Sequence, residues 1–134
     1  LTDTGFLQFK NDLNQMRQIS SIDFNRNLLI DANKTLLDTL ITLQKFKGAA
    51  IAVTKKNKLA GIFTTGDLNR LIESKKKFSF EEKIESFITK NPYSLDISDK
   101  VEDVTNIVKK HNLGQFVIMD QSKVLGILDV KDLL

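Results

Sequence analysis

The chain lacks cysteine and tryptophan, and its 134 residues include a single histidine, a single proline and a single tyrosine. Without cysteine it can form no disulfide, no thiolate metal site and no cysteine nucleophile. One histidine, His111, cannot build a histidine metal cluster, and any catalytic triad would depend on that residue alone. No nucleophile–base pair or metal cluster can be assembled, so we expect that this chain is not an enzyme.

Long hydrophobic runs are also missing. No apolar stretch approaches the roughly 20 residues that cross a bilayer, and the N-terminus has no signal-peptide pattern. Nothing in the composition requires an oxidising compartment, because there is no cysteine to oxidise. We therefore expect a soluble, cytoplasmic protein with no membrane partner, built as one domain or two very small ones.

Positive charge exceeds negative charge only modestly, with a formal net charge of +3. Lysines cluster at 55–58 and at 75–77. Nucleic-acid surfaces usually add aromatic stacking residues or a reading helix to such clusters. This chain has no Trp and one Tyr, and most of its Phe residues lie in apolar patterns typical of a protein interior. The pattern favours solvated loops, and nucleic acid is an unlikely partner.

Two parts of the sequence resemble each other at a constant offset of 65 residues. This offset aligns Gly61 with Gly126, Asp67 with Asp132, and the run 50–53 with 115–118. Because one register holds over many positions without an insertion, the sequence indicates an internal duplication.

Each copy follows the same order of elements. A short apolar stretch precedes an amphipathic segment with helical spacing, two strand-like runs joined by a short polar turn, and a final helix. In the first copy these are 28–30, 36–43, 50–54, 58–64 and a helix from Thr65; in the second they are 93–95, 101–108, 115–120, 123–129 and a helix from Val130. The predicted fold is α/β (α+β), with two β-α-β-β-α units. One unit would leave a sheet face uncovered, so we expect the two to cover each other about a pseudo-twofold axis.

Two further amphipathic segments lie outside these elements. Apolar residues recur at helical spacing near the N-terminus, at Phe6, Phe9, Leu13 and Met16. Ser79 and Glu82 have the spacing of a capping box and predict a linking helix that ends before Pro92. The predicted organisation is an N-terminal helix or linker at 1–20, a first repeat at 21–78, and the linking helix with a second repeat at 79–134.

The end of the second long strand in the first copy carries a candidate binding site. It reads Gly61-x-x-Thr64-x-Gly66-Asp67. A helix start offers unpaired N–H groups to a phosphate, and a carboxylate such as Asp67 can accept from both ribose hydroxyls. The same residues also make an ordinary helix cap, and the sequence leaves both interpretations open.

The second copy departs from this pattern. Asp129 replaces the threonine and Lys131 replaces the glycine, while Asp132 is kept. A carboxylate at 129 would repel a phosphate at close range. We therefore predict that the second site is altered or silent toward nucleotide phosphates.

The duplicated unit, with the segments 61–68 and 126–134, resembles a tandem pair of cystathionine-beta-synthase-type (CBS) domains, often called a Bateman module. The resemblance covers roughly residues 18–134. It implies a regulatory module that binds adenine or other nucleotides, with Thr64 and Asp67 at the phosphate and ribose and with Ala50 and Ile51 near the base. We add Arg70, which could reach a ligand phosphate or be solvated, and Asp132 as the retained acidic residue of the second copy.

Among CBS pairs, the sequence looks most like the C-terminal part of arabinose 5-phosphate isomerase-like sugar-phosphate isomerases, through 38–41, 61–70 and 132–134. That likeness implies a parent protein with a sugar isomerase domain of the Kdo (lipopolysaccharide) pathway, which this chain is too short to contain. A start at Leu1 rather than methionine predicts an excised fragment. No cofactor is required; AMP, ATP, or a CMP-type nucleotide or nucleotide-sugar is the expected ligand.

Two functional classes remain open at this stage. CBS pairs commonly form disc-like dimers, so the resemblance implies a homodimer. The chain is either a nucleotide sensor that biases an attached or partner protein, or a ligand-free structural dimerisation module. A regulatory pair from a different host protein is a further alternative.

Overall fold

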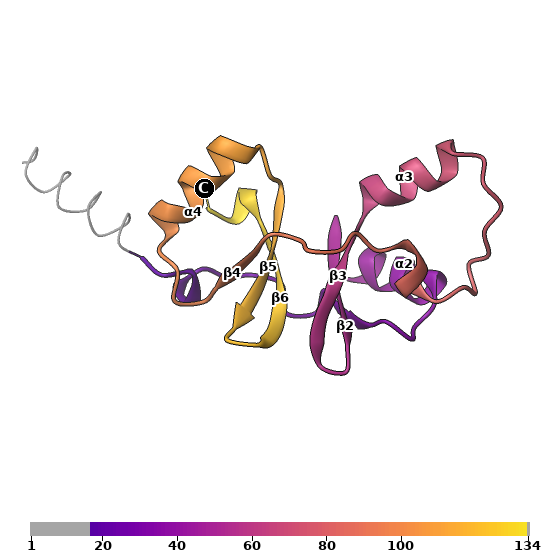
Figure 1. Cartoon of the computed structure of the whole chain (residues 1–134). Coiled ribbons are helices and arrows are strands. Elements are labelled where there is room, and N and C mark those ends of the chain that lie inside the picture. Colours follow the sequence, from indigo (N-terminus) through magenta and orange to yellow (C-terminus); the bar gives the residue numbers. More distant parts are fainter. Residues whose placement is uncertain (1–16, 134) are drawn as a thin grey trace, which may run out of the picture.

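Two three-stranded sheets of identical topology form the centre of the computed structural model, which describes residues 17–133 (Figure 1). In each sheet the first strand pairs parallel with the second, and the second pairs antiparallel with the third. The strands of the first sheet are β1 (Leu29–Asp31), β2 (Ala50–Lys55) and β3 (Lys58–Thr64). Those of the second are β4 (Ser94–Asp96), β5 (Gln115–Asp120) and β6 (Lys123–Asp129).

Helices complete both repeats and confirm the predicted β-α-β-β-α unit. The α-helices are α2 (Leu36–Lys45), α3 (Thr65–Glu73) and α4 (Val101–His111). The 3-10 turns are η1 (Ile19–Ser21), η2 (Ile84–Phe87) and η3 (Val130–Leu133). The duplication extends to fine detail, because the register of the β2–β3 pair shifts between Val53 and Thr54 and that of the β5–β6 pair between Ile118 and Met119.

The predicted linking helix is wrong, because the segment after residue 79 forms only the single turn η2. The carbonyls of Phe80 and Glu82 accept from the N–H groups at the start of α2, at 2.9 and 2.8 Å. Carbonyls that satisfy the open N-terminus of another helix are not available for bonds along their own segment. Half of the expected capping box is present, since the Ser79 N–H donates to Glu82 Oε1 at 2.9 Å.

The sequence predicts two other helices, one at each end of the chain. The helix expected from Val130 is the 3-10 turn η3 within the part of the chain that the structure describes. The N-terminal helix carrying Phe6, Phe9, Leu13 and Met16 lies outside the described residues, so it stays a prediction.

The segment that enters each repeat pairs with the sheet of the other repeat. Asn25 and Ile127 exchange two backbone hydrogen bonds of 3.0 Å, and Thr89 and Ile62 exchange two of 2.9 Å. The start of α4 is also bonded by chain that precedes the first repeat, since the Val101 N–H donates to the Arg17 carbonyl at 2.7 Å. Figure 1 shows the consequence, with the indigo N-terminal segment lying beside the half that holds α4 and β6.

The hydrophobic cores reflect this exchange. Ile19 and Phe24, which precede the first repeat, are buried in the core of the second with residues such as Phe116. Ile84, which precedes the second repeat, is fully buried in the core of the first, together with residues such as Phe63. Each repeat therefore depends on chain from the other for its core.

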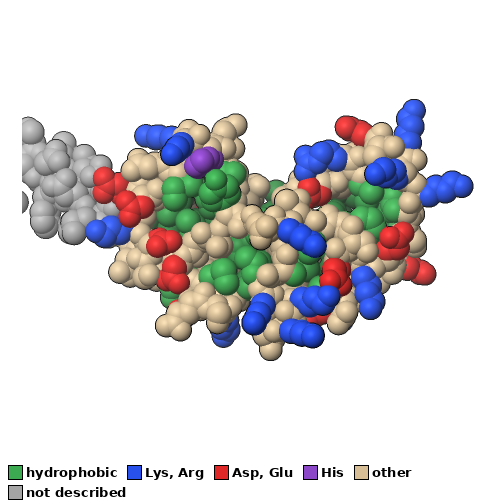
Figure 2. All heavy atoms as spheres, viewed as in Figure 1, with side chains coloured by type: hydrophobic (Ala, Val, Ile, Leu, Met, Phe, Trp, Pro, Cys, Tyr) green, Lys and Arg blue, Asp and Glu red, His purple; other side chains and the backbone are tan. Residues whose placement is uncertain are grey.

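Charged side chains of both signs occupy the surface of the first repeat. Figure 2 shows Lys and Arg side chains around the half that carries α3 and the β2–β3 hairpin, with Asp and Glu between them. Lys55 forms an ion pair with Glu85, and its hydrogen bond lowers the pKa of the Glu85 carboxyl. No helix within residues 17–133 has the length and apolar character to cross a membrane.

Candidate functional site

The turn between β3 and α3 brings Thr64 and Asp67 together as a complete capping box. The Asp67 N–H donates to Thr64 Oγ1 at 3.1 Å, and the Thr64 N–H donates to Asp67 Oδ2 at 2.9 Å. Both side chains thus satisfy the helix start, as the cap interpretation of the sequence requires.

The remaining oxygen of Asp67 is also engaged. Its Oδ1 accepts from Arg70 Nη2 and, at 3.4 Å, from the hydroxyl of Thr89. The side chain of Asp67 is only 12% exposed, whereas that of its ion-pair partner Arg70 is 70% exposed. The guanidinium therefore lies on the solvent side of the carboxylate. A ribose hydroxyl could reach this carboxylate only if Arg70 moved aside.

The structure places Ala50 and Ile51 inside the first core. Both residues are fully buried in β2, where Ala50 is the strand partner of Thr64 and Ile51 that of Phe63. Both residues are inaccessible in the structure, so their predicted place near a base stays a prediction.

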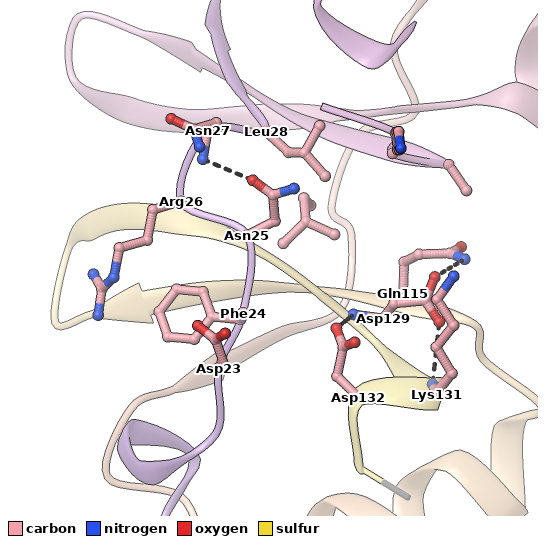
Figure 3. Close-up of a pocket in the computed structure, with 14 residues that line it drawn as sticks. Asp23, Phe24, Asn25, Arg26, Asn27, Leu28, Gln115, Asp129, Lys131 and Asp132 are labelled. Carbon is pink, nitrogen blue, oxygen red and sulfur yellow. Dashed lines mark hydrogen bonds between the residues drawn. The ribbon is translucent and has the colours of Figure 1, made fainter. Parts of the chain in front are cut away.

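A cavity of about 510 Å³ lies at the equivalent turn of the second repeat (Figure 3). Of the six predicted ligand-binding residues, only Asp132 lines it. The other lining residues come from the entry segment of the first repeat, the α2–β2 loop, the start of β5, the end of β6 and the turn η3. They are Asp23, Phe24, Asn25, Arg26, Asn27, Leu28, Lys47, Gly48, Ala49, Gln115, Ile127, Asp129 and Lys131.

Hydrogen bonds hold the β6–η3 turn in place at one side of this cavity. The Asp129 N–H donates to Asp132 Oδ2 at 3.1 Å, and the Lys131 N–H donates to Asp129 Oδ1 at 3.1 Å. Gln115 Nε2 approaches the second oxygen of Asp129 at 3.4 Å. The other oxygen of Asp132, Oδ1, has no hydrogen-bond partner among residues 17–133, so it can accept from a ligand.

The facing wall belongs to the first repeat. Asn25 is fixed there, because its side-chain amide donates to the Phe46 carbonyl at 3.2 Å and its backbone pairs with Ile127. In Figure 3 the segment with Asn25 and Leu28 faces the segment with Asp129 and Asp132. No local motif marks residues 23–28 as a wall, since they reach the cavity only through the exchange of entry segments.

The described residues contain no group of three or more His, Asp or Glu side chains arranged to hold a metal ion. The polar side chains that line the cavity carry carboxylate, amide, ammonium and guanidinium groups, which suit hydrogen bonding to an organic ligand.

This architecture is the fold of a tandem pair of CBS domains. Residues 84–134 match the family model of the CBS domain. A CBS domain protein from Pyrobaculum aerophilum, solved in complex with AMP, is similar at a TM-score of 0.75 with 13% sequence identity, over 87% of this chain and 89% of that one. The CBS domain pair of protein MJ0100, in complex with 5′-methylthioadenosine and S-adenosyl-L-methionine, is similar at a TM-score of 0.74 with 21% identity, over 87% and 95% of the chains.

One of the curated relatives is an enzyme. Arabinose 5-phosphate isomerase from Francisella tularensis is 31% identical over 83 residues, which cover 61% of this chain and 25% of the isomerase. The chain spans between a quarter and about a third of the length of the curated relatives that it matches.

Proposed function

We propose that this chain is a regulatory CBS pair that binds an adenosyl ligand in the cavity between its two repeats. The observation that carries the proposal is the 510 Å³ cavity with a free carboxylate oxygen of Asp132 on its wall. Sites for small organic ligands have volumes of roughly 300–1,000 Å³, and the volume of this cavity lies within that range.

The lining residues divide the cavity by chemistry. The Asp132 carboxylate can accept hydrogen bonds from ribose hydroxyls, as acidic residues do in dinucleotide-binding folds. The apolar side chains of Leu28, Ala49 and Ile127 offer a surface on which a flat base can pack, and Asn25 can bond to its edge. Two similar structures carry adenosyl ligands, which supports this choice over other small molecules.

The turn with Thr64, Asp67 and Arg70 remains our second candidate position. A nucleotide there would take its ribose bonds from Asp67 after Arg70 has moved, and the freed guanidinium could then bind the phosphate. In the structure this turn is a capped helix start whose polar atoms bind each other.

Regulation follows from the position of the cavity. Its walls come from both repeats, so a ligand that contacts both walls favours one relative position of the repeats. The resulting bias on an attached or partner protein cannot exceed the difference in the ligand's affinity for the two positions.

Calorimetric titration tests the proposal. The chain is titrated with adenosine, AMP, ATP, 5′-methylthioadenosine, S-adenosylmethionine and CMP, together with the variants Asp132→Asn and Asp120→Asn. We expect at least one adenosyl compound to bind, and Asp132→Asn to weaken it by about tenfold through loss of the charged acceptor.

Asp120→Asn is the matched control, because Asp120 is an exposed aspartate at the end of β5 that does not line the cavity. It should leave the affinity unchanged. Failure of every compound to bind would favour a structural module that has no ligand.

The host protein is a separate proposal. The match to arabinose 5-phosphate isomerase supports a sugar-phosphate isomerase of the lipopolysaccharide pathway as the parent, whereas the other four curated relatives are uncharacterised proteins. A CBS pair attached to another host accounts for those matches equally well. Sequencing the coding region upstream distinguishes them: a sugar isomerase domain supports the first, and any other domain supports the second.

Homodimer formation is proposed on the apolar side chains that the helices expose. Leu37 and Ile41 on α2 and Ile72 on α3 are 47%, 54% and 59% exposed. Sedimentation equilibrium tests the assembly, and a monomer at all concentrations would contradict it.

A further inference from the structure

The two turns that the duplication makes equivalent have opposite chemistry toward an anion. Resting on the proposed function, we infer that the cavity at the second turn selects nucleosides with a neutral or cationic 5′ substituent and discriminates against 5′-phosphates. Asp129 is the residue that decides this, because its carboxylate takes the place that a ligand phosphate would need.

The hydrogen bonds at the turn show how Asp129 acts. In the first repeat, the residue at this position is Thr64, whose neutral hydroxyl accepts from the N–H of Asp67. In the second repeat, the Asp129 carboxylate accepts from the N–H of Lys131, the position that corresponds to Gly66. The protein therefore places a second negative charge at the second turn, at a position where the first turn has the neutral hydroxyl of Thr64.

The neighbouring backbone donors are engaged as well. The N–H of Asp129 donates to Asp132 Oδ2, and the N–H of Val130 donates to the Gly114 carbonyl at 2.9 Å. Three successive N–H groups, at 129, 130 and 131, are therefore bonded to oxygen atoms of the protein. A phosphate at this turn would meet two carboxylates and three N–H groups that are already bonded to the protein, which is unfavourable by Coulomb's law and by hydrogen bonding.

The cations that line the cavity do not reverse this preference. Lys47, Lys131 and Arg26 are all exposed, and exposed ammonium and guanidinium groups contribute weak, screened attraction. Arg26 lies over the ring of Phe24, 4.5 Å from its centroid, and points away from the turn in Figure 3. The two carboxylates, by contrast, are held in position by backbone hydrogen bonds.

The charge of Asp129 also favours some ligands. Its second oxygen, Oδ2, has only a 3.4 Å contact with Gln115, so it can still bind a cation. A sulfonium or ammonium group on the 5′ side of a ribose held by Asp132 would gain from this charge. A neutral thioether would be tolerated, and a phosphate dianion would be repelled.

The experiment compares three adenosyl ligands that differ at the 5′ position: S-adenosylmethionine, 5′-methylthioadenosine and AMP. Calorimetric affinities are measured in the full chain carrying Asp67→Asn, which removes the proposed ribose acceptor of the first turn. We expect the first two compounds to bind at least about tenfold more tightly than AMP. The additional change Asp129→Thr, which copies residue 64, should raise the affinity for AMP by about tenfold and lower that for S-adenosylmethionine.

Two further variants act as controls. Asp129→Asn keeps an acceptor at the turn without its charge and should give intermediate selectivity. Lys131→Gln removes a neighbouring positive charge. It should weaken the binding of AMP further without changing the order of the three affinities. Circular dichroism confirms that each variant is folded.

The possible failures are distinguishable. Equal binding of AMP and 5′-methylthioadenosine, or an unchanged selectivity in Asp129→Thr, would overturn this inference while leaving the proposed function intact. Loss of all binding, in the parent chain and in every variant, would overturn the proposed function and the inference with it.

Discussion

Gly61 and Gly126 occupy equivalent places on β3 and β6, each under the entry segment of the other repeat. A side chain at Gly126 would collide with the carbonyl of Asn25, and one at Gly61 would meet the carbonyl of Thr89. Gly126 also has a φ of 155°, a conformation that residues with a Cβ rarely adopt. Glycine is thus required wherever the exchanged backbone lies directly on a strand.

Gly126→Ala should therefore destabilise the protein. We expect the free energy of unfolding to fall by about 2–4 kcal/mol, because both the backbone conformation and the contact with Asn25 are strained. Urea unfolding followed by circular dichroism measures the change. Gly114→Ala is the control, since a Cβ there would meet no atom within 4 Å, and a comparable loss in that variant would contradict the explanation.

The sequence predicts some properties of the individual site residues and not others. The duplication alone predicts that Asp132 corresponds to Asp67 and that Asp129 replaces a threonine, and the structure places both aspartates on the cavity wall. It could not predict that Arg70 covers Asp67 or that Ala50 and Ile51 are buried, because these facts depend on packing between elements. Whether these residues bind a ligand stays a prediction.

At the scale of elements, side-chain caps define where helices begin. Thr35 and Asp38 form a capping box at α2 that matches the one at α3, with bonds of 3.0 and 3.2 Å. The hydrogen bonds from Thr35, first of all from its backbone N–H, hold the pKa of the Asp38 carboxyl below its ordinary value of 3.8. The ionised form of Asp38 is therefore the form that stabilises the folded protein.

The sign of the pH dependence follows from that pKa. A carboxyl with a lowered folded-state pKa stabilises the protein above its unfolded pKa of about 4, and this contribution is lost as the pH falls through the folded value. We expect the free energy of unfolding to decline below about pH 4, and less steeply in Asp38→Asn than in the parent chain.

Urea titrations between about pH 3 and pH 6 measure this slope, and NMR titration of the Asp38 carboxyl gives the pKa itself. In Thr35→Val, which keeps the carboxyl but removes the hydroxyl, the pKa of Asp38 should rise toward 3.8. A slope that is identical in the parent chain and in Asp38→Asn would contradict the role of the cap.

In the segment after α3, local sequence signals do not decide the secondary structure. Its sequence has helical spacing and a capping pair, yet only η2 is helical. Contact with α2 withdraws its carbonyls from local bonding, so tertiary contacts override a local preference here.

At the scale of the whole molecule, each repeat is completed by chain that precedes the other. Ile19 and Ile84 are both fully buried, and each lies in the core of the repeat that it does not enter. Neither repeat can unfold without exposing residues of the segment that begins the other. We therefore expect the pair to unfold as one cooperative unit.

Truncating either isoleucine tests this expectation. Ile19→Ala and Ile84→Ala should each lower the free energy of unfolding by about 2–5 kcal/mol, because each leaves a cavity in a core. Far-UV and near-UV circular dichroism should report a single, coincident urea transition in both variants. Lys110→Ala, at an exposed side chain on α4, should change stability little. Two separate transitions would show that the repeats unfold independently.

The sequence by itself determined the duplication, the order of elements in each repeat and the CBS-type fold, because hydrophobic periodicity and turn residues are local signals that recur 65 positions apart. Only the tertiary structure decided which segments complete which core and that the β6–η3 turn lines a cavity together with the entry segment of the first repeat. The physical reason is that the entry segments choose their partners through backbone bonds and buried side chains far away in the chain, and no local pattern of residues records that choice.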